Sequence, residues 1–167
     1  MDIEETIAAI ATGLTPAGIG IIRISGQKSI EILKKIFKPK IEHFKERKMY
    51  YGKFINPSSG KTIDSGFCVV MYKPKSFTGE DVVELHCHGS LYVLHELLDA
   101  VLQSGARQAY PGEFTKRAFL NGKIDLTQAE GLIDLIHAET EKEKEAAQLS
   151  LEGYLKNELE LLKKSLI

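Results

Sequence analysis

The sequence predicts an α+β fold: a small mixed or antiparallel sheet with packed helices, followed by a long helical segment. Two patterns carry this prediction. In the first half of the chain, short runs rich in Ile and Val are separated by turns that contain Gly and Pro, as strands are. Further along, apolar residues recur every three or four positions, which is the period of a helix with one buried face. We expect two domains, residues 1–122 and residues 123–167.

Two strands and a helix are predicted at the beginning of the chain. Residues 6–12 and 19–25 are rich in Ile and Ala, and residues 13–18 between them contain two glycines and a proline. This order predicts a strand, a turn and a second strand. Residues 28–37 then place apolar side chains at helical spacing and stop before Pro39, which predicts a short amphipathic helix.

Three more strands and two helices are predicted next. Residues 49–55 and 67–72 are strand candidates joined by a turn at residues 56–60, and residues 81–88 form the third candidate. A helix should follow over residues 91–103. Its N-cap should be Ser90, and Gly105 should lie near its end. After a Tyr-Pro-Gly turn, a short helix over 113–120 should stop at Asn-Gly.

The last part of the chain is predicted to be helical. Asp125 and Gln128 have the spacing of a capping box, which opens a longer helix. A leucine stripe follows with steps of four, four, three and four: Leu151, Leu155, Leu159, Leu162 and Leu166. An apolar helical stripe needs a partner surface. We therefore expect either an oligomer or a fragment of a longer protein.

Composition narrows the class of protein. The chain has 167 residues, with 22 Lys and Arg against 23 Asp and Glu. It is too weakly charged to bind nucleic acid through phosphate neutralisation alone. We find no secretory signal and no apolar stretch of membrane-spanning length, so we expect a cytoplasmic protein without a membrane partner. Cys68 and Cys87 lie in apolar segments and should be buried free thiols.

Two glycine patterns superficially suggest nucleotide binding. Gly18-x-Gly20 lacks the third glycine of a dinucleotide fingerprint, and the Ile residues that follow favour a strand. Gly60-Lys61-Thr62 lacks the preceding glycine of a phosphate loop, and no helix follows it. We expect both segments to be structural.

A zinc site is an alternative prediction. His86 and His88 alternate along a predicted strand and should therefore share one face. The nearby candidates for further ligands are Glu84 on the same strand and His95 on the next helix. The competing interpretation is that the imidazoles are structural, so the metal remains the second choice.

Three charged residues have unusual local contexts. Arg23 interrupts an apolar run, where a permanently charged guanidinium needs a carboxylate, a phosphate or carbonyl groups unless it reaches solvent from an edge strand. Glu84 poses the same question in its own apolar strand, and its partner is either Arg23 or an amino-pyrimidine edge. Lys123 lies in a turn between two helices, where composition alone would predict a surface residue.

Three sequence blocks together resemble a known family. They comprise residues 14–26 (LTPAGIGIIRISG), residues 76–89 (SFTGEDVVELHCHG) and residues 111–126 (PGEFTKRAFLNGKIDL), the last followed by Gln128-Ala129-Glu130. In this order they are similar to the N-terminal part of the tRNA modification GTPase family MnmE/TrmE. The resemblance covers roughly residues 4–140 and is specific, since all three blocks are long.

The resemblance implies a fold and several ligands. It implies an α+β domain related to tetrahydrofolate-binding aminomethyltransferases, which binds 5-formyl-tetrahydrofolate or a related one-carbon folate and forms a homodimer. The folate contacts of the family fall on Arg23, Glu84 and Lys123 of this chain. With a flavin-dependent subunit of the MnmG type, the whole protein would place an aminomethyl-type group on C5 of the wobble uridine of certain tRNAs.

The chain also departs from the family pattern. His88-Gly89-Ser90 stands where the family often has His-Gly-Gly, a change that we expect to be harmless. The P-loop and the C-terminal Cys-x-Gly-Lys tail are missing, so GTP, magnesium and potassium would concern only the full-length protein, and the chain is interpreted as a fragment that is not active alone. No catalytic residue is assigned. A purely structural dimerisation domain is a further alternative.

Overall fold

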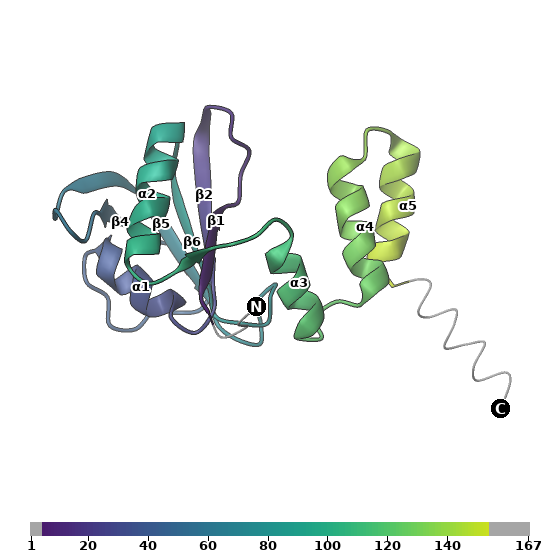
Figure 1. The fold of residues 1–167 in the computed structure, drawn as a ribbon, viewed down its shortest axis with the longest axis horizontal. Coiled ribbons are helices and arrows are strands. Elements are labelled where there is room, and N and C mark those ends of the chain that lie inside the picture. The colour runs from purple at the N-terminus through teal and green to yellow at the C-terminus, as the bar shows by residue number, and fades with distance from the viewer. Residues whose placement is uncertain (1–4, 154–167) are drawn as a thin grey trace, which may run out of the picture. The chain divides into compact units, whose positions relative to one another are not determined.

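The structure is a computed structural model and describes residues 5–153. It divides into two compact units, Met1–Phe114 and Thr115–Ile167. Within the described residues, the first unit contains a seven-stranded sheet and helices. The described part of the second unit contains helices (Figure 1). The predicted α+β class is therefore confirmed.

The strands and helices of the described part have the following bounds. The strands are β1 (Ile7–Ile10), β2 (Ala17–Ser25), β3 (Phe37–Lys38), β4 (Tyr50–Ile55), β5 (Thr62–Met71), β6 (Val82–Gly89) and β7 (Arg107–Gln108). The helices are α1 (Ser29–Ile36), α2 (Leu91–Gln103), α3 (Glu113–Leu120), α4 (Leu126–His137) and α5 (Glu141–Leu151).

The sheet is mixed and has the order β3-β4-β5-β6-β2-β1-β7. Neighbouring strands run antiparallel except for β1 and β7, which are parallel. Strands β2 and β6 lie side by side inside the sheet although the chain between them forms α1 and three other strands. The pairing of β2 with β6 places Arg23 directly opposite Glu84.

One face of the sheet carries the hydrophobic core, and α1 and α2 cover it (Figure 1). Ile22, Ile24 and Leu85 point into this core and are fully buried. Gly20 explains the tight contact with α2, because a Cβ at that position would lie 2.7 Å from a methyl carbon of Leu94. The glycine of the Gly18-x-Gly20 pattern thus serves helix–sheet packing.

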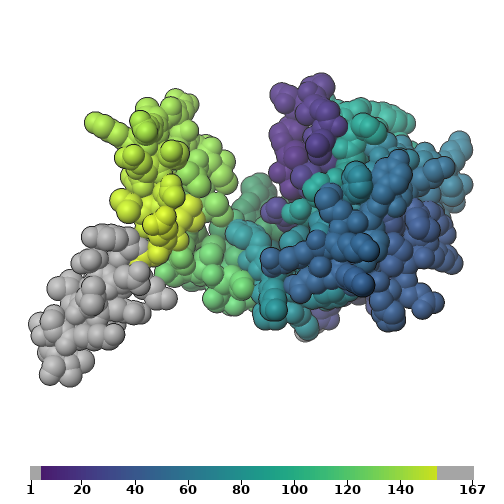
Figure 2. Space-filling view, turned by 180° about the vertical axis from the view of Figure 1, so that it is seen from behind, coloured from purple at the N-terminus to yellow at the C-terminus, as the bar shows by residue number. Residues whose placement is uncertain are grey.

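Helices α1 and α2 leave the other face of the sheet uncovered, and Figure 2 shows the molecule from behind. Alternation along the strands places Arg23, Glu84 and His86 on this face, away from the core. Apolar side chains of β2 and β4 also reach solvent there: Ile19 is 64% exposed and Tyr51 is 66% exposed. We call this side the open face of the sheet.

Helices α4 and α5 form an antiparallel pair in the second unit. Both begin with a capping box, on Asp125 for α4 and on Thr140 for α5, so the predicted box at Asp125 is confirmed. Gly131 is buried and lets the helices approach, since a Cβ there would lie 2.7 Å from Cβ of Ser150. Of the predicted leucine stripe, Leu151 ends α5 and the other four leucines lie outside the described residues.

Several local predictions need correction. Ser90 holds the N-cap position of α2, but its hydroxyl makes no capping hydrogen bond. Strand β5 begins at Thr62, five residues before the predicted start at Phe67. The two-residue strands β3 and β7 were not predicted. The turn before β5 is confirmed, because the side chain of Asn56 accepts hydrogen bonds from two following backbone amides.

Candidate functional site

An ion pair between Arg23 and Glu84 lies on the open face. The two residues are cross-strand partners on β2 and β6. The Arg23 guanidinium donates to Oε1 of Glu84 from Nε at 2.9 Å and from Nη2 at 2.8 Å. The Arg23 side chain is 32% exposed and that of Glu84 is 18% exposed. The predicted need of Arg23 for a carboxylate is therefore met, and the edge-strand alternative is wrong because β2 is an interior strand.

The second carboxylate oxygen of Glu84 faces a histidine. Nε2 of His86 lies 3.5 Å from Oε2 of Glu84. The same nitrogen is buried and has no hydrogen-bond partner among the described residues. Its cross-strand neighbours, Ile21 on β2 and Phe67 on β5, are apolar. Glu84 is the charged group toward which this ring nitrogen is directed.

A hydroxyl cluster lies near one end of the Arg23 strand. The hydroxyl of Ser25, at the end of β2, lies 2.7 Å from Oγ1 of Thr78 and donates to Oε2 of Glu80 at 2.7 Å. These bonds hold the loop that precedes β6 against the end of β2. The ring centroid of Phe114 lies 5.8 Å from the guanidinium carbon of Arg23. The ion pair is thus bordered by an ordered polar loop and by an aromatic ring.

Lys123 falls in the second unit, in the turn after α3. Its backbone amide donates to the carbonyl of Ala118 at 2.8 Å, and its side chain is exposed. Of the three predicted folate contacts, the structure brings Arg23 and Glu84 together within the first unit.

The zinc alternative is not favoured by the geometry. His88 is 72% exposed, and its Nδ1 lies 2.9 Å from Asp64. His95 lies on α2, which covers the core face, whereas His86 is on the open face. Within residues 5–153, no group of three or more His, Cys, Asp or Glu side chains is arranged to hold a metal ion.

Asp64 is a polar residue that sequence reasoning missed. Burial alone would raise the pKa of its carboxyl, but hydrogen bonds from the backbone and ring of His88 outweigh this and lower it below the ordinary value of 3.8. The bonds join β5 to the end of β6. Little in the sequence indicated its role, because Asp64 lies in the part of β5 that had not been predicted as a strand.

A groove of about 390 Å³ runs along the open face beside His86. Its apolar lining comes from three strands and the residue before β4, with Ile19, Met49, Tyr51 and Phe67 contributing side chains. The rings of Tyr51 and Phe67 lie 5.2 Å apart. Sequence reasoning did not single out these residues, although their alternation with core residues places them on this face.

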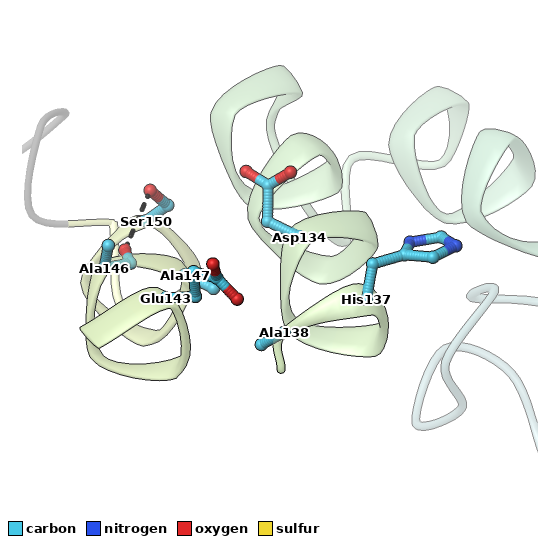
Figure 3. A pocket seen from close by; sticks show the side chains of 7 residues that line it. All are labelled: Asp134, His137, Ala138, Glu143, Ala146, Ala147 and Ser150. Atoms are coloured by element: carbon cyan, nitrogen blue, oxygen red, sulfur yellow. Dashed lines mark hydrogen bonds between the residues drawn. The ribbon is translucent and has the colours of Figure 1, made fainter. Parts of the chain in front are cut away.

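A second hollow, of about 330 Å³, lies between the two helices of the second unit (Figure 3). Its lining comprises Asp134, His137, Ala138, Glu143, Ala146, Ala147 and Ser150. Figure 3 shows the His137 ring pointing away from α5, and its Nδ1 lies 2.9 Å from the carbonyl oxygen of Ile133. The lining side chains therefore do not converge on one point.

A further ion-pair network lies where β7 leads into α3. Arg107 donates to both oxygens of buried Glu113, at 3.0 and 2.8 Å, and to Glu5 at 2.7 Å. Glu113 also accepts from the backbone amide of Tyr110 at 2.8 Å. The hydrogen bonds that Arg107 donates to Glu113 are the main reason that the pKa of Arg107 is raised. This network fixes the chain between β7 and the start of α3.

None of the helices among residues 5–153 is both long and apolar enough to cross a membrane.

Comparison with known proteins identifies the family. Residues 6–123 match the family model described as "GTP-binding protein TrmE N-terminus". The chain is 48% identical over 171 residues to the tRNA modification GTPase MnmE of Alkaliphilus oremlandii, with 100% of this chain and 37% of that protein covered. It is 49% identical over 167 residues to MnmE of Syntrophus aciditrophicus, with 99% and 36% covered.

The chain belongs to the TrmE N-terminal family, and the predicted resemblance is confirmed. It spans about a third of the length of the curated relatives that it matches. The matched region of the family model contains Arg23 and Glu84 and ends at Lys123.

Proposed function

We propose that this chain is the folate-binding and dimerising part of a tRNA modification GTPase. The observation that carries the folate assignment is the partly buried ion pair of Arg23 and Glu84 on the open face of the sheet. Its two residues come from strands far apart in sequence. Family membership supports the assignment, since the relatives are named tRNA modification GTPases.

The donor and acceptor groups fit a one-carbon tetrahydrofolate. A carboxylate is an acceptor for the amino group and ring N–H of a pterin, and Arg23 holds only one of the two oxygens of Glu84. Arg23 uses only Nε and Nη2 on Glu84, so its other guanidinium N–H groups can donate to oxygen atoms of the ligand. A ligand that lacks these N–H groups would cover Oε2 of Glu84 without donating to it, which is costly, so this arrangement discriminates against such ligands.

Lys123 is proposed as a third folate contact. It occupies the lysine position of the block Asn-Gly-Lys-Ile-Asp-Leu, and its side chain is exposed in the turn after α3. An ammonium group suits the carboxylate groups of the folate glutamate tail as a charged donor. This assignment rests on the family motif.

The open face of the sheet is the surface that we propose for dimerisation. Exposed Ile19, Met49, Tyr51 and Phe67 line one groove there. An apolar patch on a sheet face that α1 and α2 leave uncovered favours burial against another surface. A second copy of the chain would provide the same patch, as a two-fold interface requires.

The activity of the whole protein is proposed from its relatives. GTP hydrolysis, with its magnesium and potassium ions, would depend on residues beyond the region aligned here. We propose that the full-length protein acts with a flavin-dependent subunit of the MnmG type on the wobble uridine of certain tRNAs, in the cytoplasm. No residue of this chain is assigned to catalysis.

Isothermal titration with 5-formyl-tetrahydrofolate tests the proposed function. We expect saturable binding with one ligand for each chain. Sedimentation should give about twice the 18.6 kDa mass of the chain. A dimer without saturable folate binding would instead support the alternative of a purely structural dimerisation domain.

A further inference from the structure

We infer that His86 is a positioning residue for Glu84: its Nε2–H holds the second carboxylate oxygen, while Arg23 holds the first. The inference rests on the proposed folate site and adds a residue that the family resemblance does not supply. The starting observation is the buried Nε2 of His86, which has no hydrogen-bond partner among the described residues and lies 3.5 Å from Oε2 of Glu84.

The surroundings of the His86 ring decide which nitrogen carries the proton. A neutral imidazole has one N–H and one bare nitrogen. A bare Nε2 would direct its lone pair at the oxygen of Glu84, which is unfavourable for two acceptors. An N–H at the same position has an acceptor oxygen 3.5 Å from its nitrogen and needs a shift of only a few tenths of an ångström to reach hydrogen-bond distance. The Nε2–H form therefore fits the site.

The other charged and titratable groups near the ring do not compete for this role. On β2, Arg23 is directed to Oε1 of Glu84. On β5, Asp64 accepts its hydrogen bonds from His88. Tyr51 of β4 lines the same groove as His86, at its apolar side. Oε2 of Glu84 is the acceptor that remains for Nε2.

This arrangement has a consequence for ligand binding. A carboxylate held at both oxygens, by Arg23 on one side and His86 on the other, is fixed in rotation before the ligand arrives. Each oxygen has two lone pairs, so Oε2 can accept from His86 and from a ligand N–H together. Loss of the His86 donor should therefore weaken folate binding without removing any direct ligand contact.

The tautomer of His86 can be measured directly. In the protein labelled with ¹⁵N-histidine, ring nitrogen shifts distinguish an Nε2–H from an Nδ1–H imidazole. We expect His86 in the Nε2–H form. We expect His88 in the opposite form, because its Nδ1 faces Asp64 at 2.9 Å, and His88 is thus an internal control. Glu84→Gln should perturb the shifts of His86 and leave those of His88 unchanged. An Nδ1–H form of His86 would overturn the inference.

Two substitutions of His86 test whether a hydrogen-bond donor at the position of Nε2 is what matters, rather than the shape of the side chain. Glutamine places its amide near the position of Nε2, whereas asparagine places it near Nδ1. We expect His86→Gln to keep the affinity for 5-formyl-tetrahydrofolate within about twofold, and His86→Asn to weaken it about tenfold, the range for a hydrogen bond to a charged group. Equal affinity in both variants, or equal loss in both, would contradict the positioning role.

The two experiments also separate this inference from the proposed function. Circular dichroism of each variant should show the wild-type fold. If the wild-type protein binds no folate, the proposed function fails. The nitrogen shifts alone then decide whether His86 holds Glu84.

Discussion

Arg23 donates two hydrogen bonds to one oxygen of Glu84 and leaves the other oxygen for other donors. The distances to Oε1 are 2.9 Å from Nε and 2.8 Å from Nη2, whereas Oε2 has His86 at 3.5 Å. The pair therefore joins strands β2 and β6 and still retains acceptor capacity on the open face. Structural and ligand-binding roles of the pair can be tested separately.

The stability of the first unit should depend on the fork shape of Arg23. Lysine carries the same charge but cannot donate from two nitrogen atoms, so Arg23→Lys should lower the free energy of unfolding by about 0.5–1 kcal/mol. Arg23→Ala should lower it by about 1–2 kcal/mol, because it leaves Glu84 without its partner. Urea denaturation measures both. Lys34→Ala on the exposed side of α1 is the control, and an equal effect there would contradict the prediction.

The buried carboxylate of Glu113 should stabilise the segment between β7 and α3. It accepts from Arg107 at both oxygens and from the amide of Tyr110. Glu113→Gln should lower the free energy of unfolding by about 1–3 kcal/mol, since an oxygen acceptor is replaced by an N–H donor facing Arg107. Glu46→Gln, in an exposed pair with Arg47 at 3.8 Å, should change it by less than about 0.5 kcal/mol. Similar losses in the two variants would show that burial of the network is unimportant.

Both cysteines should be unreactive in the folded protein. Burial raises the pKa of Cys68 to about 12. Burial, together with the charge of Asp64, raises the pKa of Cys87 to about 11. Because the thiolate is the nucleophile, neither residue should react with iodoacetamide at pH 8 within an hour, and both should react in urea. Mass spectrometry of the alkylated chain checks this. Rapid modification of the native protein would be inconsistent with the structure.

Asp64 should make stability depend on pH in the acid range. Its pKa in the folded protein lies below the ordinary value of 3.8. Its contribution is therefore fully present above that value and is lost as the pH falls through the folded-state pKa. The difference in unfolding free energy between wild type and Asp64→Asn should be largest near neutral pH and should shrink below about pH 4. Urea denaturation across this range is the measurement, and a constant difference would contradict the prediction.

Much of the fold was predictable because local and tertiary preferences agree. The strands around Arg23 and Glu84 are β-branched runs, and helix α2 has the predicted bounds, Leu91–Gln103. The beginning of β5 was missed because residues 62–66 contain Asp, Ser and Gly, which have low strand propensity. They are held as a strand by pairing with β4, where Gly66 lies opposite Gly52.

Part of the candidate site could also be predicted from the sequence. Arg23 and Glu84 stood out because each interrupts an apolar strand, and Arg23 was one of the partners expected for Glu84. The contribution of His86 could not be predicted. It depends on the side chains that surround its ring in the folded sheet and on the oxygen of Glu84 that lies beside its Nε2. From the sequence, His86 was interpreted as a structural or hydrogen-bonded imidazole, with a zinc ligand as the second choice.

The most direct test of the central claim is the folate affinity of Glu84→Gln. Isothermal titration with 5-formyl-tetrahydrofolate would compare wild type, Glu84→Gln and Glu31→Gln, which removes an exposed carboxylate of α1 far from the open face. If Glu84 receives the pterin N–H groups, its amide variant should bind at least about tenfold more weakly, while Glu31→Gln should bind as wild type does. Equal affinity of all three proteins would contradict the assignment of this ion pair as the folate site.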